Sequence, residues 1–152
     1  MLEATATKPV DILLVEDNPG DVDLARDALE DGKINNRLHV VTDGEAAMAF
    51  LRKQAQYQQA PRPDLILLDL NLPKKDGIEV LAEIKGDDSL KRIPVVILTT
   101  SQAEEDILKS YNLHANCYLT KPLHVGQFFS LVKSIESFWL SIVVLPPHGD
   151  PQ

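Results

Sequence analysis

The chain has 152 residues, of which 44% are hydrophobic and 25% charged, the composition of an ordinary soluble globular domain. Its 23 acidic residues exceed its 15 lysines and arginines, and the resulting net charge of −8 disfavours direct binding to DNA or RNA. A single cysteine excludes an internal disulfide, and neither a signal peptide nor an apolar run long enough for a membrane helix is present. These features predict one cytoplasmic domain over residues 1–152, with a core at about 8–140 and a tail at about 141–152.

Short apolar runs alternate with amphipathic stretches, which is typical of a parallel sheet with crossover helices. In chain order, the first half predicts strand Val10–Val15, a helix from Pro19 that Gly32 ends, strand Leu38–Thr42, a helix after Asp43-Gly44, and a helix end with an extended loop at Gln54–Pro63. The second half predicts strand Leu65–Asp69, a helix after Gly77, strand Ile93–Leu98, a helix after Ser101, strand Cys117–Leu119 and a last helix, Val125–Ile142.

Local signals support the helix starts. Asn18-Pro19 supplies a capping residue and a proline suited to the first turn, and Ser101–Glu104 has the form of a capping box. The helix residues expected to face the core are Val22, Ala25, Leu29, Ala46, Ala47, Phe50, Leu51, Ile78, Leu81 and Ile84.

The elements predict an α/β fold, a doubly wound (βα)5 domain with a five-stranded parallel sheet in the flavodoxin-like order 2-1-3-4-5. In such sheets ligands bind beyond the carboxyl ends of the strands, where the strand order reverses. Here that point lies between the first and third strands.

Both of these strands end in acidic residues. Glu16-Asp17 follows the first strand, and Asp69 ends the third. Three carboxylates at one edge repel one another, and a hard divalent cation relieves that repulsion. Mg²⁺ is suited to the position because it takes few protein oxygens and readily shares a phosphate oxygen.

Thr99 and Lys121 are expected to reach the same edge from the fourth and fifth strands. A hydroxyl and an ammonium beside a cation suit phosphoryl oxygens, and phosphoryl transfer needs mainly positioning and charge neutralisation. Asp69 is the expected nucleophile and would form an aspartyl phosphate. Taken singly, each of these residues also has an ordinary structural explanation, as a loop cap, a strand-end threonine or a surface lysine.

Together, Glu16-Asp17, Asp69, Thr99 and Lys121-Pro122 resemble, in order and position, the receiver domains of bacterial two-component response regulators. The resemblance covers about residues 8–140. It implies that Asp69 accepts a phosphoryl group from a phosphohistidine of a sensor histidine kinase. It also implies that Thr99 and Lys121 contact the phosphoryl oxygens.

The segment after Asp69 carries the same resemblance, because Asn71-Leu72-Pro73 and Asp76-Gly77 are similar to the loop that follows the phosphoacceptor in that family. The resemblance implies that Asp17, Asp69 and the backbone carbonyl of Asn71 bind Mg²⁺. Glu16 would act through water. Thr99 and Tyr118 would form the switch that reports phosphorylation.

Longer stretches, at 60–73, 116–121, 137–140 and 145–147, look like the small response regulators paired with cyanobacterial phytochromes. Those are single-domain proteins that tend to dimerise, so the resemblance implies a phytochrome-type histidine kinase as partner and a homodimer. Apolar residues beyond one stripe of the last helix also indicate self-association: Phe129, Phe138 and Val143-Val144-Leu145.

The expected function is a receiver domain without an output domain, which phosphorylates and dephosphorylates only itself and signals through protein contacts. Two other functions remain open. An aspartyl phosphohydrolase typically has a second acid two residues after its nucleophile, where this chain has Asn71. An interaction module that takes up no phosphate would not need the complete set of acids, threonine and lysine.

Overall fold

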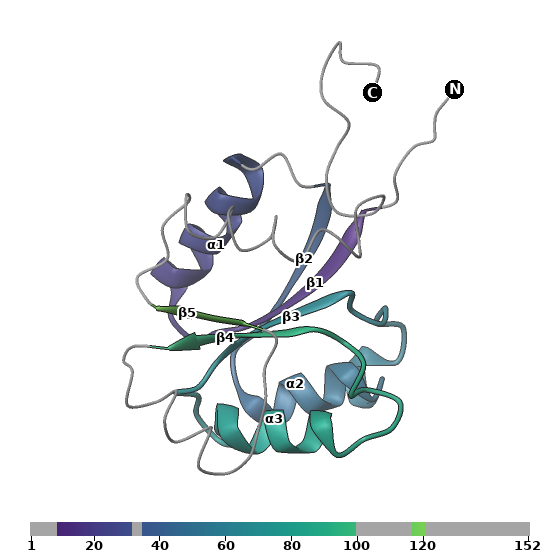
Figure 1. The fold of residues 1–152 in the computed structure, drawn as a ribbon. Helices are drawn as coiled ribbons and strands as arrows, with labels where there is room; N and C mark the ends of the chain where they lie inside the picture. The colour runs from purple at the N-terminus through teal and green to yellow at the C-terminus, as the bar shows by residue number, and fades with distance from the viewer. Residues whose placement is uncertain (1–8, 32–34, 100–116, 121–152) are drawn as a thin grey trace, which may run out of the picture.

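A parallel sheet of five strands lies at the centre of the part of the chain that the structure describes (Figure 1). The computed structural model describes residues 9–31, 35–99 and 117–120. The strands are β1 (Val10–Val15), β2 (Asn36–Val41), β3 (Leu65–Asp69), β4 (Val95–Thr99) and β5 (Cys117–Thr120). The helices are α1 (Pro19–Asp31), α2 (Gly44–Leu51) and α3 (Gly77–Lys85), with a short 3-10 helix, η1 (Ala55–Tyr57), before β3. The strand order β2-β1-β3-β4-β5 confirms the predicted topology.

Helix α1 covers one face of the sheet, and helices α2 and α3 cover the other (Figure 1). The two layers follow from the alternation of side chains along each strand. On β3, Leu65 and Leu67 belong to the buried cluster that includes α1. Ile66 and Leu68 belong to the cluster that includes α2 and α3. Because both faces are covered, β1 and β3 are buried along their whole length and appear in the sequence as continuous apolar runs.

The bounds of β2 differ from the prediction because strand pairing sets them. The strand begins at Asn36 rather than Leu38 and ends at Val41 rather than Thr42. Its parallel ladder with β1 already starts where Val10 pairs with Asn36. Backbone pairing thus includes two polar residues that hydrophobic periodicity leaves out.

Strand β4 begins two residues later than expected and extends one residue further, to Thr99. Pro94 has no N–H to donate to a ladder, and the N–H of Ile93 donates instead to the carbonyl oxygen of Leu90 at 3.0 Å. Strand β5 also extends one residue beyond its prediction, to Thr120.

Each described α-helix begins within one residue of its predicted start, next to a side-chain cap. Asn18 accepts hydrogen bonds from two backbone N–H groups of the first turn of α1, at 2.8 and 3.1 Å. Asp43 caps α2 in the same way at 2.7 Å. Asp76 and Glu79 form a capping box at the start of α3, in addition to the predicted helix-start signals.

Most helix residues expected in the core are buried, but Val22, Ala46 and Ile78 are only partly buried and pack against its margin. In the first turn of α3, the fully buried hydrophobic side chain is that of Val80 rather than that of Ile78. Gly32, the helix expected after Ser101, the last helix and the tail lie outside the described residues. Within the described ranges, none of the helices is both long enough and apolar enough to cross a membrane.

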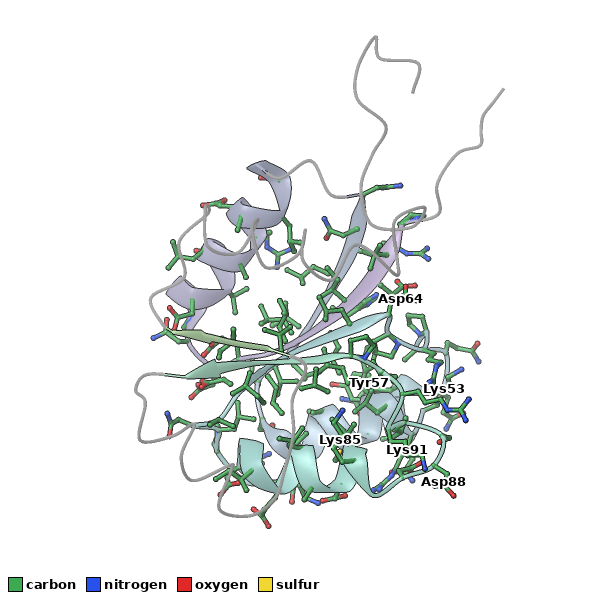
Figure 2. The ribbon with its side chains drawn as sticks, in the orientation of Figure 1. Lys53, Tyr57, Asp64, Lys85, Asp88 and Lys91 are labelled. Atoms are coloured by element: carbon green, nitrogen blue, oxygen red, sulfur yellow. The ribbon has the colours of Figure 1, made fainter. Side chains whose placement is uncertain are left out.

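A buried charged residue, Asp11, lies near the start of β1, in a strand that is otherwise apolar. Asp11 is 8% exposed, and its carboxylate contacts Arg37 Nε at 3.1 Å and His39 Nε2 at 3.0 Å. Asp64, just before β3, accepts a hydrogen bond from the Asp11 N–H at 2.9 Å. Figure 2 shows Asp64 and Tyr57 on this side of the molecule, where β3 begins. The loop before β3 therefore lies away from the edge at which the strands end.

Candidate functional site

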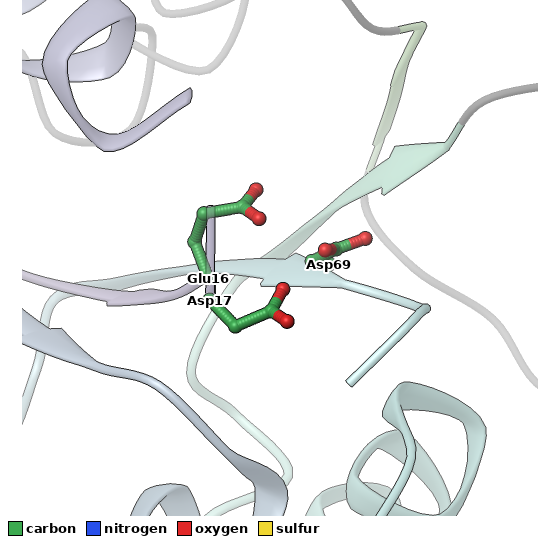
Figure 3. Close-up of side chains that lie close together, drawn as sticks. All are labelled: Glu16, Asp17 and Asp69. Carbon is green, nitrogen blue, oxygen red and sulfur yellow. The ribbon is translucent and has the colours of Figure 1, made fainter. Parts of the chain in front are cut away.

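Three carboxylates meet where β1 and β3 end. The parallel register pairs Val15 with Leu68, so Glu16 and Asp17 follow β1 beside Asp69. One carboxylate oxygen from each acid lies within 4.8 Å of the others, and Figure 3 shows the three side chains next to one another. Glu16 and Asp69 are 0% and 2% exposed, whereas Asp17 is exposed.

This donor set fits a hard divalent cation. Two like charges at this separation repel by roughly 3 kcal/mol at an effective dielectric constant of about 20. Burial of two of the three acids removes most of the water that would otherwise screen them. Carboxylate oxygens are the ligands that Mg²⁺ prefers, and a few of them suffice because the ion keeps several waters. The residues present therefore suit the metal that the sequence predicted.

Backbone N–H groups orient two of the three acids. The N–H of Asn18 donates to Glu16 Oε2 at 3.2 Å, and the N–H of Asn71 donates to Asp69 Oδ1 at 3.1 Å. Both hydrogen bonds are made to residues only two positions further along the chain. The turn that follows each of these acids thus helps to fix the orientation of its carboxylate.

Thr99 ends β4 at the same edge. Asp69 pairs with Leu98, so Thr99 lies one position beyond the strand partner of Asp69. Tyr118 lies in β5 and pairs with Ile97. Lys121 lies outside the described residues.

The segment that follows Asp69, residues 70–76, is here called the acceptor loop. It closes where the N–H of Gly77 donates to the carbonyl oxygen of Leu70 at 3.0 Å. It contains Asn71, whose backbone carbonyl the resemblance assigns to the metal. Lys74 adopts a left-handed backbone conformation, with a φ of 67°.

An ion-pair network that the sequence analysis missed ties the acceptor loop to two helices. Lys75 Nζ pairs with Glu83 Oε2 on α3, and Arg52 Nη1 at the end of α2 approaches Glu83 Oε1 at 3.2 Å. Arg52 Nε also lies 4.0 Å from Asp87 Oδ2. Arg52 and Glu83 are 31 positions apart, so no local sequence pattern could have indicated their contact.

The hydrogen bond from Lys75, together with the nearby charge of Arg52, holds the pKa of Glu83 below its usual value. A carboxyl with a lowered folded-state pKa stabilises the fold above its unfolded-state pKa and loses that contribution as the pH falls through the folded value. We therefore expect Glu83→Gln to lower the free energy of unfolding by about 0.5–1 kcal/mol at neutral pH. The difference should shrink as the pH falls below about 4.5.

Urea denaturation at a series of pH values measures this difference. Glu30→Gln, which removes an exposed carboxylate from α1, is the control for deleting a surface charge. A Glu83→Gln difference that stays constant between neutral and acid pH would contradict the assigned interaction.

Comparisons with known proteins agree with the geometry. A model of the "response regulator receiver domain" family matches residues 12–133. Response regulator Rcp1 of Synechocystis sp. is 57% identical over 138 residues, which cover 91% of this chain and 94% of Rcp1. A crystal structure of the phosphorylated cyanobacterial phytochrome response regulator RcpA has a TM-score of 0.74 and 56% identity, covering 92% of this chain and 100% of that one. The Mn²⁺-bound form of Rcp1 has a TM-score of 0.74 and 57% identity, covering 91% of this chain and 100% of the other.

Proposed function

Since this chain belongs to the response regulator receiver domain family of two-component systems, we propose that Asp69 is its phosphoacceptor in a Mg²⁺-dependent reaction. The observation that supports the proposal most directly is the convergence of Glu16, Asp17 and Asp69 within 4.8 Å at the strand ends. The similarity to a phosphorylated response regulator and to a Mn²⁺-bound one supports both the phosphoryl group and the metal.

In this proposal a carboxylate oxygen of Asp69 attacks the phosphorus of a phosphohistidine. A P–O bond forms, the P–N bond breaks, and the imidazole leaves. Asp17, Asp69 and the backbone carbonyl of Asn71 hold Mg²⁺, and Glu16 acts through water. The bound ion supplies positive charge to the phosphoryl oxygens.

Thr99 and Lys121 have the complementary role of contacting those oxygens as charge moves onto the phosphoryl group. Thr99 and Tyr118 then form the switch, which biases a pre-existing equilibrium between two conformations. The chain catalyses only its own phosphorylation and dephosphorylation, and the signal leaves by altered protein contacts.

We infer the partner from the relatives. Rcp1 is a response regulator, and RcpA is a cyanobacterial phytochrome response regulator. The proposed phosphoryl donor is accordingly a phytochrome-type sensor histidine kinase, which the chain meets in the cytoplasm. The chain is proposed to form a homodimer through the last helix and tail, which analytical ultracentrifugation before and after phosphorylation would test.

The deciding experiment is the intact mass of the wild-type protein after incubation with Mg²⁺ and acetyl phosphate. The expected result is a single added phosphoryl group that is absent when EDTA replaces Mg²⁺. No adduct, despite Mg²⁺ binding detected by calorimetry, would favour the interaction module that takes up no phosphate. Steady turnover of a phosphate monoester would instead favour the phosphohydrolase.

A further inference from the structure

Helix α2 begins in backbone contact with the acceptor loop, although all of β3 separates the two in the sequence. A Cβ atom placed on Gly44 would lie 1.8 Å from the carbonyl oxygen of Lys75 and 2.6 Å from its carbonyl carbon. These atoms belong to the backbone and cannot rotate away as a flexible side chain could. Any residue larger than glycine at this position must therefore displace the loop or the helix.

The requirement for glycine here is one of space rather than of backbone conformation. Gly44 is the first residue of α2, and its φ lies outside the left-handed region. Its N–H donates to the carbonyl oxygen of Pro73 at 3.5 Å. Beside it, Asp43 Oδ2 lies 3.8 Å from Lys74 Nζ. Three consecutive residues of the acceptor loop thus contact the start of α2.

The start of the acceptor loop is in similarly close backbone contact with the first residue of α3. A Cβ atom on Gly77 would lie 2.4 Å from the carbonyl oxygen of Asp69 and 2.5 Å from the Cα of Leu70. Helix α3 therefore begins against the backbone of the proposed phosphoacceptor. Held by α3 at one end and α2 at the other, the loop that carries Asn71 has little freedom to move relative to Asp69.

We propose that Gly44 is a positioning residue for the metal site. By admitting the backbone of Lys75 into direct contact with α2, it holds the acceptor loop, and with it the Asn71 carbonyl, close to Asp17 and Asp69. This inference rests on the proposed function, because it takes the Asn71 carbonyl as a metal ligand. Gly44 acts only through the loop and touches neither the metal nor the phosphoryl group.

The first test compares Gly44→Ala with Gly86→Ala in calorimetric titrations with Mg²⁺. Gly86 is the C-cap residue that follows α3, with a φ of −86°. Apart from its chain neighbours, the nearest atom to an added Cβ would be the carbonyl oxygen of Ala82, at 3.2 Å. We expect Gly44→Ala to raise the Kd for Mg²⁺ at least about tenfold and Gly86→Ala to change it less than about twofold. At saturating Mg²⁺, phosphoryl incorporation into Gly44→Ala should return to within about twofold of the wild-type rate, because Asp69 itself is unchanged.

A second pair of variants loosens the loop without inserting an atom into the contact. Lys74→Gly removes the partner of Asp43 and relaxes a left-handed residue of the loop. Lys53→Gly makes the same change at a left-handed lysine outside the loop, with a φ of 56°. The Kd for Mg²⁺ should rise at least about threefold for Lys74→Gly and stay within about twofold for Lys53→Gly. This pair decides the question if Gly44→Ala does not fold.

A folded Gly44→Ala variant with the wild-type Kd would overturn the inference, and so would equal effects of the two lysine substitutions. Loss of both affinity and saturated rate in Gly44→Ala, with a lowered urea midpoint, would also count against it, because general damage to the fold predicts that result. In each case a wild-type phosphoryl adduct would leave the proposed function standing. Absence of the adduct from the wild type would instead remove the proposed function itself.

Discussion

Asp69→Asn is expected to abolish the phosphoryl adduct and, in the absence of Mg²⁺, to make the domain more stable than the wild type. The amide is not nucleophilic enough to replace the carboxylate, so phosphoryl incorporation should fall below detection. The same change removes one of three charges that lie within 4.8 Å of one another. We expect the free energy of unfolding to rise by about 1–3 kcal/mol as that repulsion is lost.

Intact-mass measurement and urea denaturation, each with and without Mg²⁺, test both parts of this prediction. Mg²⁺ should stabilise the wild type, because a ligand of the native state shifts the folding equilibrium, and should stabilise Asp69→Asn much less. Asp76→Asn is the matched control, since it makes the same substitution in the acceptor loop and asparagine caps a helix as well as aspartate does. A phosphoryl adduct on Asp69→Asn would show that another residue is the acceptor.

Asp17→Asn is expected to weaken metal binding strongly, with the Kd for Mg²⁺ rising about 100-fold, which corresponds to about 2.7 kcal/mol. Asp17 is the exposed member of the carboxylate cluster and is proposed to bind the ion directly. Glu16→Gln should raise the Kd less, by about tenfold, because Glu16 is proposed to act through water. Calorimetric titration with Mg²⁺ measures both values.

Asp23→Asn provides the comparison for Asp17→Asn, because Asp23 is an exposed acid of α1 outside the carboxylate cluster. The Kd of Asp23→Asn for Mg²⁺ should stay within about twofold of the wild-type value. An effect of Glu16→Gln as large as that of Asp17→Asn would contradict the division into a direct ligand and a water-mediated one. Equal, small effects of all three substitutions would argue against a metal site in the cluster.

The grouping of the three acids at one edge of the sheet could be predicted from the amino-acid sequence. Asp69 and Glu16-Asp17 could be placed at one edge because parallel strands end on the same side and because the predicted strand order makes their strands neighbours. Neither inference needs a side-chain contact. The sequence thus predicted which residues form the carboxylate cluster, whereas the folded structure shows that one oxygen of each lies within 4.8 Å of the others.

The exact strand bounds and the buried face of α3 could not be predicted from the sequence. The bounds of β2 and β4 shifted by one or two residues, because pairing across the sheet includes the polar Asn36 and turn hydrogen bonding excludes Ile93. In α3, the orientation of the helix against the sheet favours burial of Val80 over Ile78, although both are apolar. Each of these outcomes depends on a partner outside the local sequence.

Hydrophobic periodicity and strand-end acids are local properties of the chain, and they were enough to predict the fold class and the residues available for chemistry. The strand order followed from the fold class. How the acceptor loop is held depends instead on contacts made in the folded molecule. The close approach of Gly44 to Lys75 and the ion pairs of Glu83 join segments that the sequence keeps apart. Such contacts form only when packing of the helices on the sheet brings those segments together, so a glycine that appears in the sequence as an ordinary helix start becomes a constraint on the site.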